Sequence, residues 1–453
     1  MFWNQLKQSV GEIYSPRTPE GKGRLITLTS GMVAAFYNVF ITGIFYTGFL
    51  SMYDISITGV GIVTFIPYIA SCFSLFSPRI LGRYQRRKWI LLGSKIYFYA
   101  MYIIATTLMP LFVTDPDQRL LWFVILLFLA YGVYALFSPG FTTWFYNFYP
   151  AENDSRTRFF KYNQVFSSVL SCLMLLGSSI LTDAVEGSAM QNQLILIFRY
   201  FAFVLVLVDV GLQAMAKEYP YAEVPKLQFK KVFTIPFGYK KFMLCMAVMF
   251  IWNYLNNLNN GIWNFHLLNN LGFSYTVINA VGMMSTIWLL CTVGVWQRLL
   301  HRFSWIKTFG IACVAFAPTE FLMFSLTPGD EGMWAIASVV QQICSVGFNL
   351  AYANILYLNL PREESTACIS FNTIGCNLFA FLGMITGTLV SSIGGEGTIS
   401  FLGRELFAVQ FTTLMRCIFL VSLGLWMAIS WRKFTPDDDI ERIDSLKRRK
   451  VAQ

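Results

Sequence analysis

Residues 78–88 read PRILGRYQRRK and form a short basic segment between two apolar runs, 57–76 and 89–112. A helix needs roughly 20 mostly apolar residues to cross about 30 Å of hydrocarbon, and both runs are long enough. Lys and Arg are retained on the cytoplasmic side of a membrane far more strongly than acidic residues are. The segment is therefore expected to be a cytoplasmic loop that joins two membrane spans.

Apolar runs of this kind recur along the whole chain. The expected spans lie at approximately 25–50, 57–76, 89–112, 119–146, 160–183, 191–215, 242–266, 275–297, 305–327, 332–358, 366–393 and 406–431. With 56% hydrophobic residues, 13% charged residues and a mean hydropathy of +0.54, the 453-residue chain lacks the polar groups to cover a surface in water. The predicted fold class is an all-α polytopic membrane protein with twelve transmembrane helices.

The basic residues fall on every second connection between these runs. Of the 34 Lys and Arg residues, 29 lie in the segments expected inside the cell, and Arg119 and Arg404 lie in the segments expected outside. This bias predicts a multi-pass protein of the plasma membrane with both termini in the cytoplasm. The net charge of +10 then reflects topology and anionic lipid headgroups, and no nucleic-acid partner is expected.

The residues that carry most catalytic and metal chemistry are sparse or scattered. All nine cysteines fall in or at the ends of apolar spans without a CxxC pair, so they are interpreted as small core hydrophobes. His266 and His301 stand alone, which leaves a metal site without a ligand set. No nucleotide-binding glycine motif occurs. No enzyme activity, catalytic residue, metal or cofactor is therefore expected.

An internal repeat divides the chain into six plus six spans. Arg79–Lys88 and Arg298–Lys307 run in step at a constant offset of 219, and the longest internal polar stretch, 217–241, separates the halves. The expected parts are a cytoplasmic N-terminal segment 1–24, a six-helix bundle 25–215, a basic cytoplasmic linker 216–241, a second six-helix bundle 242–431 and a cytoplasmic tail 432–453.

Five asparagines share one face of the seventh span, if residues 242–266 form a continuous helix. Asn253, Asn256, Asn257, Asn260 and Asn264 follow the spacing i, i+3, i+4, i+7, i+11, whereas Asn259 is expected to point off this stripe. An unpaired amide in hydrocarbon costs several kcal/mol, so the stripe cannot face lipid. It lines a watery cavity or bonds to other helices, and the presence of five amides at mid-membrane depth favours the cavity.

The twelve spans, the basic linker after the sixth and the loop 78–88 together resemble the major facilitator superfamily of transporters over about residues 24–432. The family pattern in this loop is approximately G-x-x-x-D-R-x-G-R-R/K. The chain keeps Arg83, Arg86 and Arg87, whereas Gly82 replaces the family's Asp. Pro78 and Gln85 also depart from its glycines, which puts in doubt the charge contact that the loop's Asp usually makes.

The resemblance implies that spans 1, 4, 7 and 10 line a central cavity and that spans 3, 6, 9 and 12 form an outer scaffold. The candidate substrate-binding residues on the cavity spans are Asn38, Thr42, Tyr46, Tyr131, Tyr134, Asn253, Asn256, Asn257, Asn260, Trp263, Asn264, Gln342, Asn349 and Tyr352. Among them, Asn38, Thr42 and Tyr46 are expected to share one face of span 1. The candidate gating residues on the two repeated loops are Arg79, Arg83, Arg86, Arg87, Arg298 and Arg302.

The charged residues within the membrane are expected on the scaffold spans, and none on the cavity spans away from their ends. Lys95 matches Asp209 in depth, and Glu320 matches Arg416. Each is interpreted as a structural ion pair, since a lone buried charge is far costlier than a paired one. Arg199 has no evident partner, so it is expected to reach outward to the interface and is the best single candidate for an anion contact.

The expected function is secondary active or facilitated transport of a small polar solute by alternating access, in which two bundles expose a central site to one side at a time. Amides interleaved with aromatic rings favour a sugar or glycoside, followed by nucleoside or amino-acid-like solutes. A drug or metabolite exporter is the alternative; a drug exporter usually has an embedded cavity carboxylate. A non-transporting receptor or lipid scramblase is the alternative of another class. The expected partners are a small-molecule substrate and membrane lipids, with a monomeric chain.

The topology gives the first prediction. Residues 217–241 and 432–453 contain thirteen of the Lys and Arg residues, so both are expected to be cytoplasmic. Single cysteines placed there in a background without the native cysteines should react with a membrane-impermeant maleimide only after the cells are permeabilised. Reaction in intact cells would show the topology to be inverted.

Overall fold

The computed structural model of the chain describes residues 11, 13–150, 153–220, 229–356, 358–361, 365–393, 398–401, 403–435 and 440–441. Within them, ten helices are long and apolar enough to cross a membrane, or up to twelve if two bent helix pairs each count as one span. The bent pairs are Val232–Gly238 with Lys240–Asn270 and Tyr275–Leu289 with Cys291–Leu300. The all-helical, polytopic fold class predicted from the sequence is confirmed.

The chain divides into two compact units, the first formed by residues 1–55 and 69–226 and the second by 56–68 and 227–453. The elements up to residue 214 are α2 (Pro19–Ile41), α3 (Gly43–Ser51), α4 (Ile57–Ser71), a 3₁₀ turn (Cys72–Phe76), α5 (Ser77–Leu81), α6 (Lys88–Tyr99), a π-helical segment (Ala100–Ala105), α7 (Thr106–Phe112), α8 (Pro116–Tyr146), α9 (Asn153–Asp183) and α10 (Ala189–Ala214). Most of α4 packs with the second unit.

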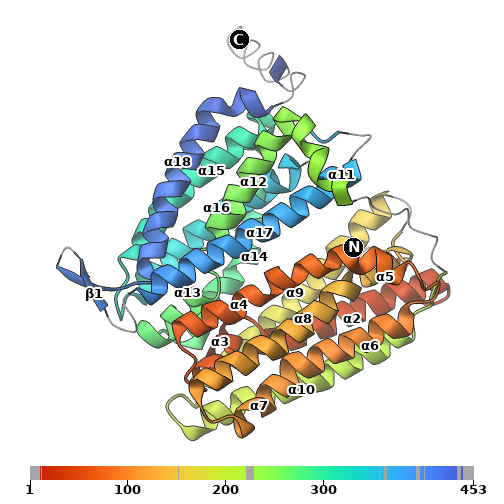
Figure 1. Ribbon diagram of the computed structural model, residues 1–453, viewed down its shortest axis with the longest axis horizontal. Coiled ribbons are helices and arrows are strands. Elements are labelled where there is room, and N and C mark those ends of the chain that lie inside the picture. The colour runs from red at the N-terminus through yellow and green to blue at the C-terminus, as the bar shows by residue number, and fades with distance from the viewer. Residues whose placement is uncertain are drawn as a thin grey trace, which may run out of the picture. The chain divides into compact units, whose positions relative to one another are not determined.

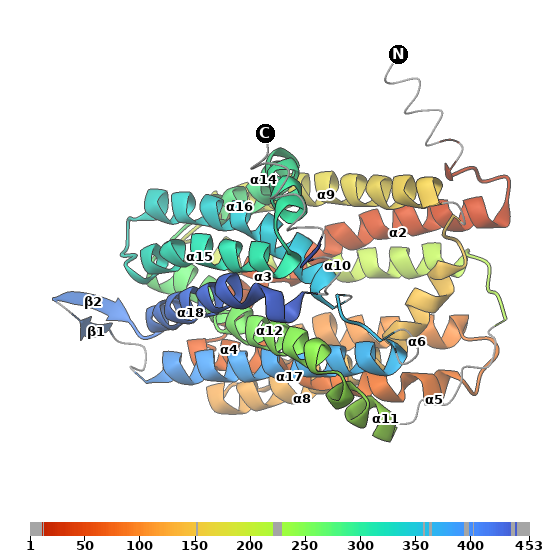
Figure 2. The same ribbon diagram turned by 90° about the horizontal axis from the view of Figure 1, so that it is seen from above.

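The elements of the second half are α11 (Phe229–Thr234), a 3₁₀ turn (Pro236–Gly238), α12 (Lys240–Asn257), α13 (Ile262–Phe265), a π-helical segment (His266–Asn270), α14 (Tyr275–Arg302), α15 (Trp305–Phe324), α16 (Glu331–Ile355), α17 (Ser365–Ser392), β1 (Thr398–Phe401), β2 (Arg404–Phe407) and α18 (Gln410–Phe434). The two strands form an antiparallel hairpin in the register Thr398↔Phe407, at one end of α18 (Figure 2). This hairpin was not predicted from the sequence.

The same helix pairings recur in both units, as an internal repeat requires. The first spanning helix packs on the fifth and sixth, as α2 does on α9 and α10, and α12 on α17 and α18. The third packs on the fourth and sixth, as α6 does on α8 and α10, and α15 on α16 and α18 (Figure 1). The repeat seen in the sequence loops therefore corresponds to repeated packing.

The first span, expected over 25–50, corresponds to residues 19–51 and contains a one-residue break. α2 ends at Ile41, Thr42 is extended with φ −129° and ψ 176°, and α3 begins at Gly43, whose φ is +58°. Gly43 adopts the left-handed region because it has no Cβ to clash there. The break separates Asn38 and Thr42, which are exposed, from Tyr46, which is buried. The three therefore do not share a face, and that expectation is wrong.

Asp209 on α10 lies at the centre of a buried polar network in the first unit. Lys95 Nζ on α6 lies 2.7 Å from Asp209 Oδ2, which confirms the pairing expected from their depths. Ser30 and Tyr37 on α2 donate hydrogen bonds to the same carboxylate at 2.5 and 3.0 Å. The carboxylate has no exposed surface. Gln213 on α10 itself donates a fourth hydrogen bond to Asp209 Oδ1 at 3.1 Å, so the carboxylate ties α2, α6 and α10 together.

Arg199 on α10 is fully buried, so the expectation that it reaches outward to the interface is wrong. Its guanidinium donates to Thr107 Oγ1 and Thr106 Oγ1 at 2.8 Å and to the Tyr102 carbonyl at 2.9 Å. It also lies 3.7 Å from the centre of the Phe49 ring. These partners belong to the π-helical turn of the third span and its end, where the helical hydrogen-bond pattern shifts. Arg199 therefore links α10 to that turn by hydrogen bonds.

The cysteines follow the sequence interpretation in part. Cys245, Cys313, Cys344, Cys368 and Cys376 are buried in the core, whereas Cys72 and Cys291 are exposed. An apolar exposed residue is compatible with a lipid-facing position, which sequence patterns do not separate from a core position. Most of the predicted tail 432–453 and part of the predicted linker 216–241 lie outside the described residues. Arg362 also lies outside them.

α17 approaches α12 more closely than any side chain would permit. A Cβ added to Gly383 would lie 2.2 Å from the Tyr254 carbonyl oxygen, and one added to Gly387 would lie 1.7 Å from the Leu258 carbonyl oxygen. The four-residue spacing of these glycines places both on the face of α17 that meets α12. α17 therefore contacts the C-terminal end of α12, which is the part of the helix that contains Asn253, Asn256 and Asn257.

The close approach leads to the second prediction. Gly387→Ala should push α17 away from α12 and destabilise the protein by about 1–3 kcal/mol, as overpacking of a filled core does. Its melting temperature in detergent should fall accordingly. Gly282→Ala on α14 is the matched control, because a Cβ there meets no atom within 4 Å and alanine favours a helix. Equal melting temperatures for the two variants would contradict the close packing.

Candidate functional site

The seventh span is interrupted, so its five asparagines do not form one continuous stripe. α12 ends at Asn257, residues 258–261 form a turn, and Gly261 has φ +81°. A Cβ on Gly261 would also lie 2.5 Å from Thr64 Oγ1 on α4. Both the positive φ and this close contact therefore require glycine at the position. The predicted continuous helix over 242–266 is therefore wrong. The asparagines instead lie on both sides of this turn and line two separate pockets.

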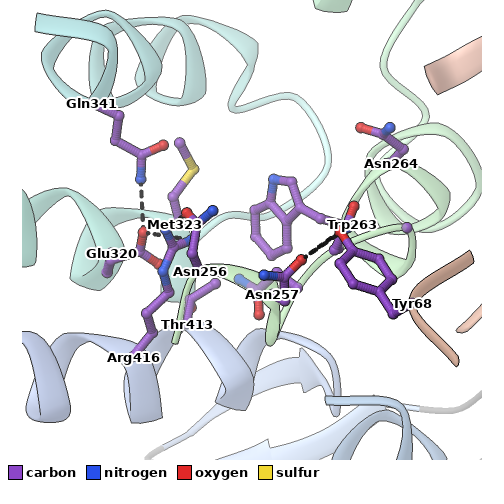
Figure 3. A pocket seen from close by; sticks show the side chains of 13 residues that line it. Tyr68, Asn256, Asn257, Trp263, Asn264, Glu320, Met323, Gln341, Thr413 and Arg416 are labelled. Atoms are coloured by element: carbon purple, nitrogen blue, oxygen red, sulfur yellow. Dashed lines mark hydrogen bonds and ion pairs between the residues drawn. The ribbon is translucent and has the colours of Figure 1, made fainter. Parts of the chain in front are cut away.

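The larger of these pockets lies within the second unit and has a volume of about 380 Å³ (Figure 3). Cavities of about 300–1,000 Å³ are the usual size of small-molecule sites. It is lined by Tyr68, Asn256, Asn257, Asn259, Asn260, Gly261, Trp263, Asn264, Glu320, Met323, Gln341, Thr413 and Arg416. Six of these thirteen residues contribute carboxamides, and Trp263 adds one large aromatic ring. Four of the five stripe asparagines belong to this set, whereas Asn253 does not.

One end of the pocket contains an ion pair. Arg416 Nη1 on α18 lies 3.2 Å from Glu320 Oε1 on α15, and Glu320 is 1% exposed. Gln341 on α16 donates to the same carboxylate oxygen at 3.1 Å, and Arg416 Nη2 donates to Asn256 Oδ1 at 3.3 Å. Figure 3 shows these side chains gathered on one side. The pairing predicted from depth is confirmed, but the pair also borders the pocket.

Asn257 anchors the opposite end of the pocket. Its amide oxygen accepts from the Tyr68 hydroxyl at 2.9 Å (Figure 3). The same oxygen accepts from Asn260 Nδ2 at 3.2 Å, and the amide nitrogen donates to the Asn253 carbonyl at 2.8 Å. The residue is 6% exposed. These bonds close the end of α12 against α4, since Tyr68 belongs to the stretch of α4 that packs with the second unit. Asn257 is therefore a structural joint as well as part of the lining.

Asn259 differs from its neighbours because its side chain forms no hydrogen bond within the described part of the chain. The residue is 8% exposed, and its Oδ1 is buried without a partner. It lines the pocket, so the expectation that it points off the stripe is wrong. The error follows from the helix break, because residue 259 belongs to the turn and no longer obeys helical spacing.

Asn253 opens into a second pocket of about 340 Å³ in the same unit, on the other side of the break. Its lining consists of Met249, Asn253, Tyr352, Leu356, Asn372, Thr373, Cys376 and Asn377. Asn253 Nδ2 donates to the Tyr352 hydroxyl at 2.6 Å. The structure thus brings Asn253 and Tyr352 together as the sequence suggested. It separates both from the larger pocket.

The remaining predicted binding residues do not converge on either pocket. Tyr131 and Tyr134 on α8 pack against the ring of Phe98, with centroids 5.0 and 4.5 Å apart. Tyr46 packs against Tyr102, and Gln342 Nε2 donates to the Val281 carbonyl at 2.8 Å. Asn38, Thr42 and Asn349 are exposed. A role of these residues in binding stays a prediction.

Among the six predicted gating residues, Arg87 is the one that is buried. It is 5% exposed, its backbone N–H donates to the Glu218 carboxylate, and its Nε donates to the Tyr84 carbonyl at 2.9 Å. Lys88 Nζ donates to the Ala216 carbonyl at 2.8 Å. The other five, Arg79, Arg83, Arg86, Arg298 and Arg302, are exposed. The loop therefore binds the end of the sixth span, and gating stays a prediction.

Several pocket residues were not predicted as binding residues. Glu320 and Arg416 were expected only as a structural pair on scaffold spans, and Tyr68, Met323, Gln341 and Thr413 lie on spans 2, 9, 10 and 12. The two charged residues lie on the scaffold spans, as expected, and they nevertheless line this pocket. The intramembrane charge of Glu320 was the signal that could have found it, because such charges mark functional sites by default.

The structure defines a polytopic helical membrane protein built from two units with repeated helix packing. No family model matches the sequence, and no curated protein sequence matches it. The structure is similar to the crystal structure of the nucleoside transporter NupG, with a TM-score of 0.64 at 13% identity, covering 91% of this chain and 99% of that one. The fold is therefore one that solved transporters share.

Two further solved structures show the same likeness. A bacterial metal transporter matches with a TM-score of 0.63 at 10% identity over 92% of this chain and 99% of that chain. The xylose transporter XylE from E. coli, in an inward open conformation, matches with a TM-score of 0.61 at 11% identity over 93% and 98%. The chain therefore shares its fold with these solved transporters.

The ion pair leads to the third prediction. Arg416→Ala should strand the buried Glu320 carboxylate and destabilise the protein by about 3–5 kcal/mol, the usual cost of breaking a buried pair. A double apolar replacement, Glu320→Leu with Arg416→Met, should recover much of the loss in melting temperature. If the double variant loses as much stability as the two single variants combined, the two side chains do not stabilise each other.

Proposed function

We propose that the protein is a transporter that moves a small polar solute across the membrane by alternating access, either down a gradient or coupled to a second gradient. The amide pocket carries this proposal. Its six carboxamides offer donors and acceptors in turn, and Trp263 offers an apolar face. Sugars and glycosides present hydroxyl groups around a ring whose faces are partly apolar, so they complement such a lining. A sugar or glycoside is therefore the favoured solute.

The charges of the pocket support an uncharged solute. In the described part of the chain, the charged lining residues are Glu320 and Arg416, which are paired at 3.2 Å. Their charges sum to zero. A solute with a net charge would therefore find no free opposite charge in the lining to offset the cost of its burial. The nucleoside transporter NupG and the xylose transporter XylE, which share this fold, carry solutes of the polyhydroxylated kind by their names.

The alternatives fit the pocket less well. An exporter of lipophilic drugs commonly uses an embedded carboxylate, which Glu320 does supply, but the abundance of amides in the lining suits a polar solute better. A receptor or lipid scramblase would not need a compact amide pocket of this size. The proposal places a single chain in the plasma membrane with both termini in the cytoplasm, which the distribution of Lys and Arg supports.

The fourth prediction tests this function on the purified protein. Uncharged sugars and glycosides, amino acids and lipophilic cations are compared in a thermal-unfolding screen, because a ligand at 100 times its Kd stabilises by about 2.7 kcal/mol. The sugar class should raise the melting temperature, and the same compound should exchange across proteoliposomes in a saturable way. Stabilisation by lipophilic cations alone would favour an exporter, and phospholipid movement without solute exchange would favour a scramblase.

A further inference from the structure

The second pocket, of about 340 Å³, has a polar wall that hydrogen bonds connect across three helices of the second unit. Asn253 Nδ2 on α12 donates to the Tyr352 hydroxyl on α16 at 2.6 Å, and this hydroxyl lies 3.5 Å from Cys376 Sγ on α17. Cys376 Sγ in turn donates to Asn372 Oδ1 at 3.3 Å. These contacts hold the polar side chains of α12, α16 and α17 close together around one cavity.

Two amides in this wall keep hydrogen-bonding capacity for a ligand. Asn377 forms no side-chain hydrogen bond with any described residue. Asn253 uses its Nδ2 for Tyr352 and the Met249 carbonyl, whereas its Oδ1 accepts no bond from the described part of the chain. Both residues are partly exposed, and neither group belongs to the buried atoms that lack a partner in the described structure. Both groups therefore keep accessible surface in the wall of the pocket.

The lining of the second pocket indicates the chemistry of its ligand. Its described residues include no charged side chain and combine three carboxamides and two hydroxyl groups with the apolar Met249 and Leu356. A charged ligand would find no opposite charge in this lining. Hydroxyl groups can both donate to and accept from carboxamides. An uncharged ligand with several hydroxyl groups and an apolar face therefore fits the pocket.

The two pockets are neighbours along α12. Asn257, which lines the larger pocket, donates through its Nδ2 to the carbonyl of Asn253, which lines the second, at 2.8 Å. Four residues of helix correspond to about 6 Å along its axis. α12 begins at Lys240, next to the linker 216–241, so the second pocket is the nearer of the two to this linker along α12. The distribution of Lys and Arg predicts that the linker is cytoplasmic.

We propose that the second pocket is a second solute site, which binds one molecule of the same uncharged, polyhydroxylated solute on the predicted cytoplasmic side of the larger pocket. This inference rests on the proposed function for the class of solute, and it adds that each chain binds two molecules. Asn377 and Asn253 Oδ1 contact the solute hydroxyls. Both pocket volumes, about 380 and 340 Å³, fall within the usual range of small-molecule sites, so each pocket can hold a molecule of its own.

Equilibrium dialysis of the purified protein counts the bound molecules. The probes are D-glucose, D-galactose, D-mannose and their methyl glycosides, labelled with tritium, and the tightest binder is taken to saturation. Two molecules should bind per chain. Thr373→Phe should reduce this number to one, because Thr373 is exposed in the lining of the second pocket and a larger side chain there fills the cavity. The melting temperature of this variant shows that it is folded.

Single amide deletions assign each bound molecule to a pocket. Asn377→Ala loses no hydrogen bond to a described residue, so its ligand-free melting temperature should equal that of the unmodified protein. It should bind one of the two molecules at least about tenfold more weakly, as the loss of one or two hydrogen bonds to a buried ligand implies.

Asn264→Ala is the matched control in the larger pocket. Asn264 is also partly exposed, and its side chain forms no hydrogen bond with any described residue. The variant should weaken binding of the other molecule. The two losses should add in the double variant, because the two amides line separate pockets.

The outcomes separate the second site from the proposed function. Binding of one molecule per chain to the unmodified protein would overturn the second site and leave the proposed function standing. The second site would also be wrong if Asn377→Ala and Thr373→Phe both bound two molecules with unchanged affinity. If no uncharged sugar binds, the proposed class of solute is wrong, and so is the second site that rests on it.

Discussion

Hydrocarbon offers no hydrogen bonds, and this constraint governs where every buried polar group of the chain lies. Each unsatisfied group within a bilayer costs several kcal/mol, so charged and amide side chains must find partners inside the protein. Asp209 gathers Lys95, Ser30 and Tyr37 around one carboxylate. The same constraint makes the few polar groups without partners informative, because the fold accepts their cost only at particular places.

Three buried polar residues illustrate different solutions. Arg199 is satisfied largely by carbonyl and hydroxyl oxygens of a π-helical turn and by an aromatic face, in place of an acidic partner. Glu320 is satisfied by Arg416 and Gln341, yet it borders a pocket. Asn259 lacks a partner altogether within the described residues. Arg199 has a structural role, whereas Glu320 and Asn259 both line the larger pocket, which is the proposed solute site.

The pocket exists because one helix is prevented from continuing. Gly383 and Gly387 let α17 press against the end of α12, and Gly261 turns the backbone away against α4. Asparagines at and beside the interruption then line the larger pocket. Broken helices lined by polar groups near a binding site are a recurrent device of transporters. Here the break converts a row of amides into two pockets of different character.

The sequence by itself determined the membrane class, the spans, the repeat and the matching of the buried charges. Length, hydropathy and the positions of Lys and Arg suffice for the spans and their expected orientation, because the bilayer imposes its thickness on any chain. Depth alone paired Lys95 with Asp209 and Glu320 with Arg416. The fold of solved transporters could likewise be anticipated from these patterns.

The tertiary structure decided which of the amides share a pocket. Helical periodicity placed Asn259 off the stripe and Asn253 on it, whereas the break at residues 258–261 reverses both assignments. That break depends on contacts with α4 and α17, which lie far away in sequence, and no local pattern encodes them. Likewise, only packing shows that the charged pair of spans 9 and 12 meets the asparagines of span 7. The site is a property of converging helices, and periodicity within a single helix cannot describe it.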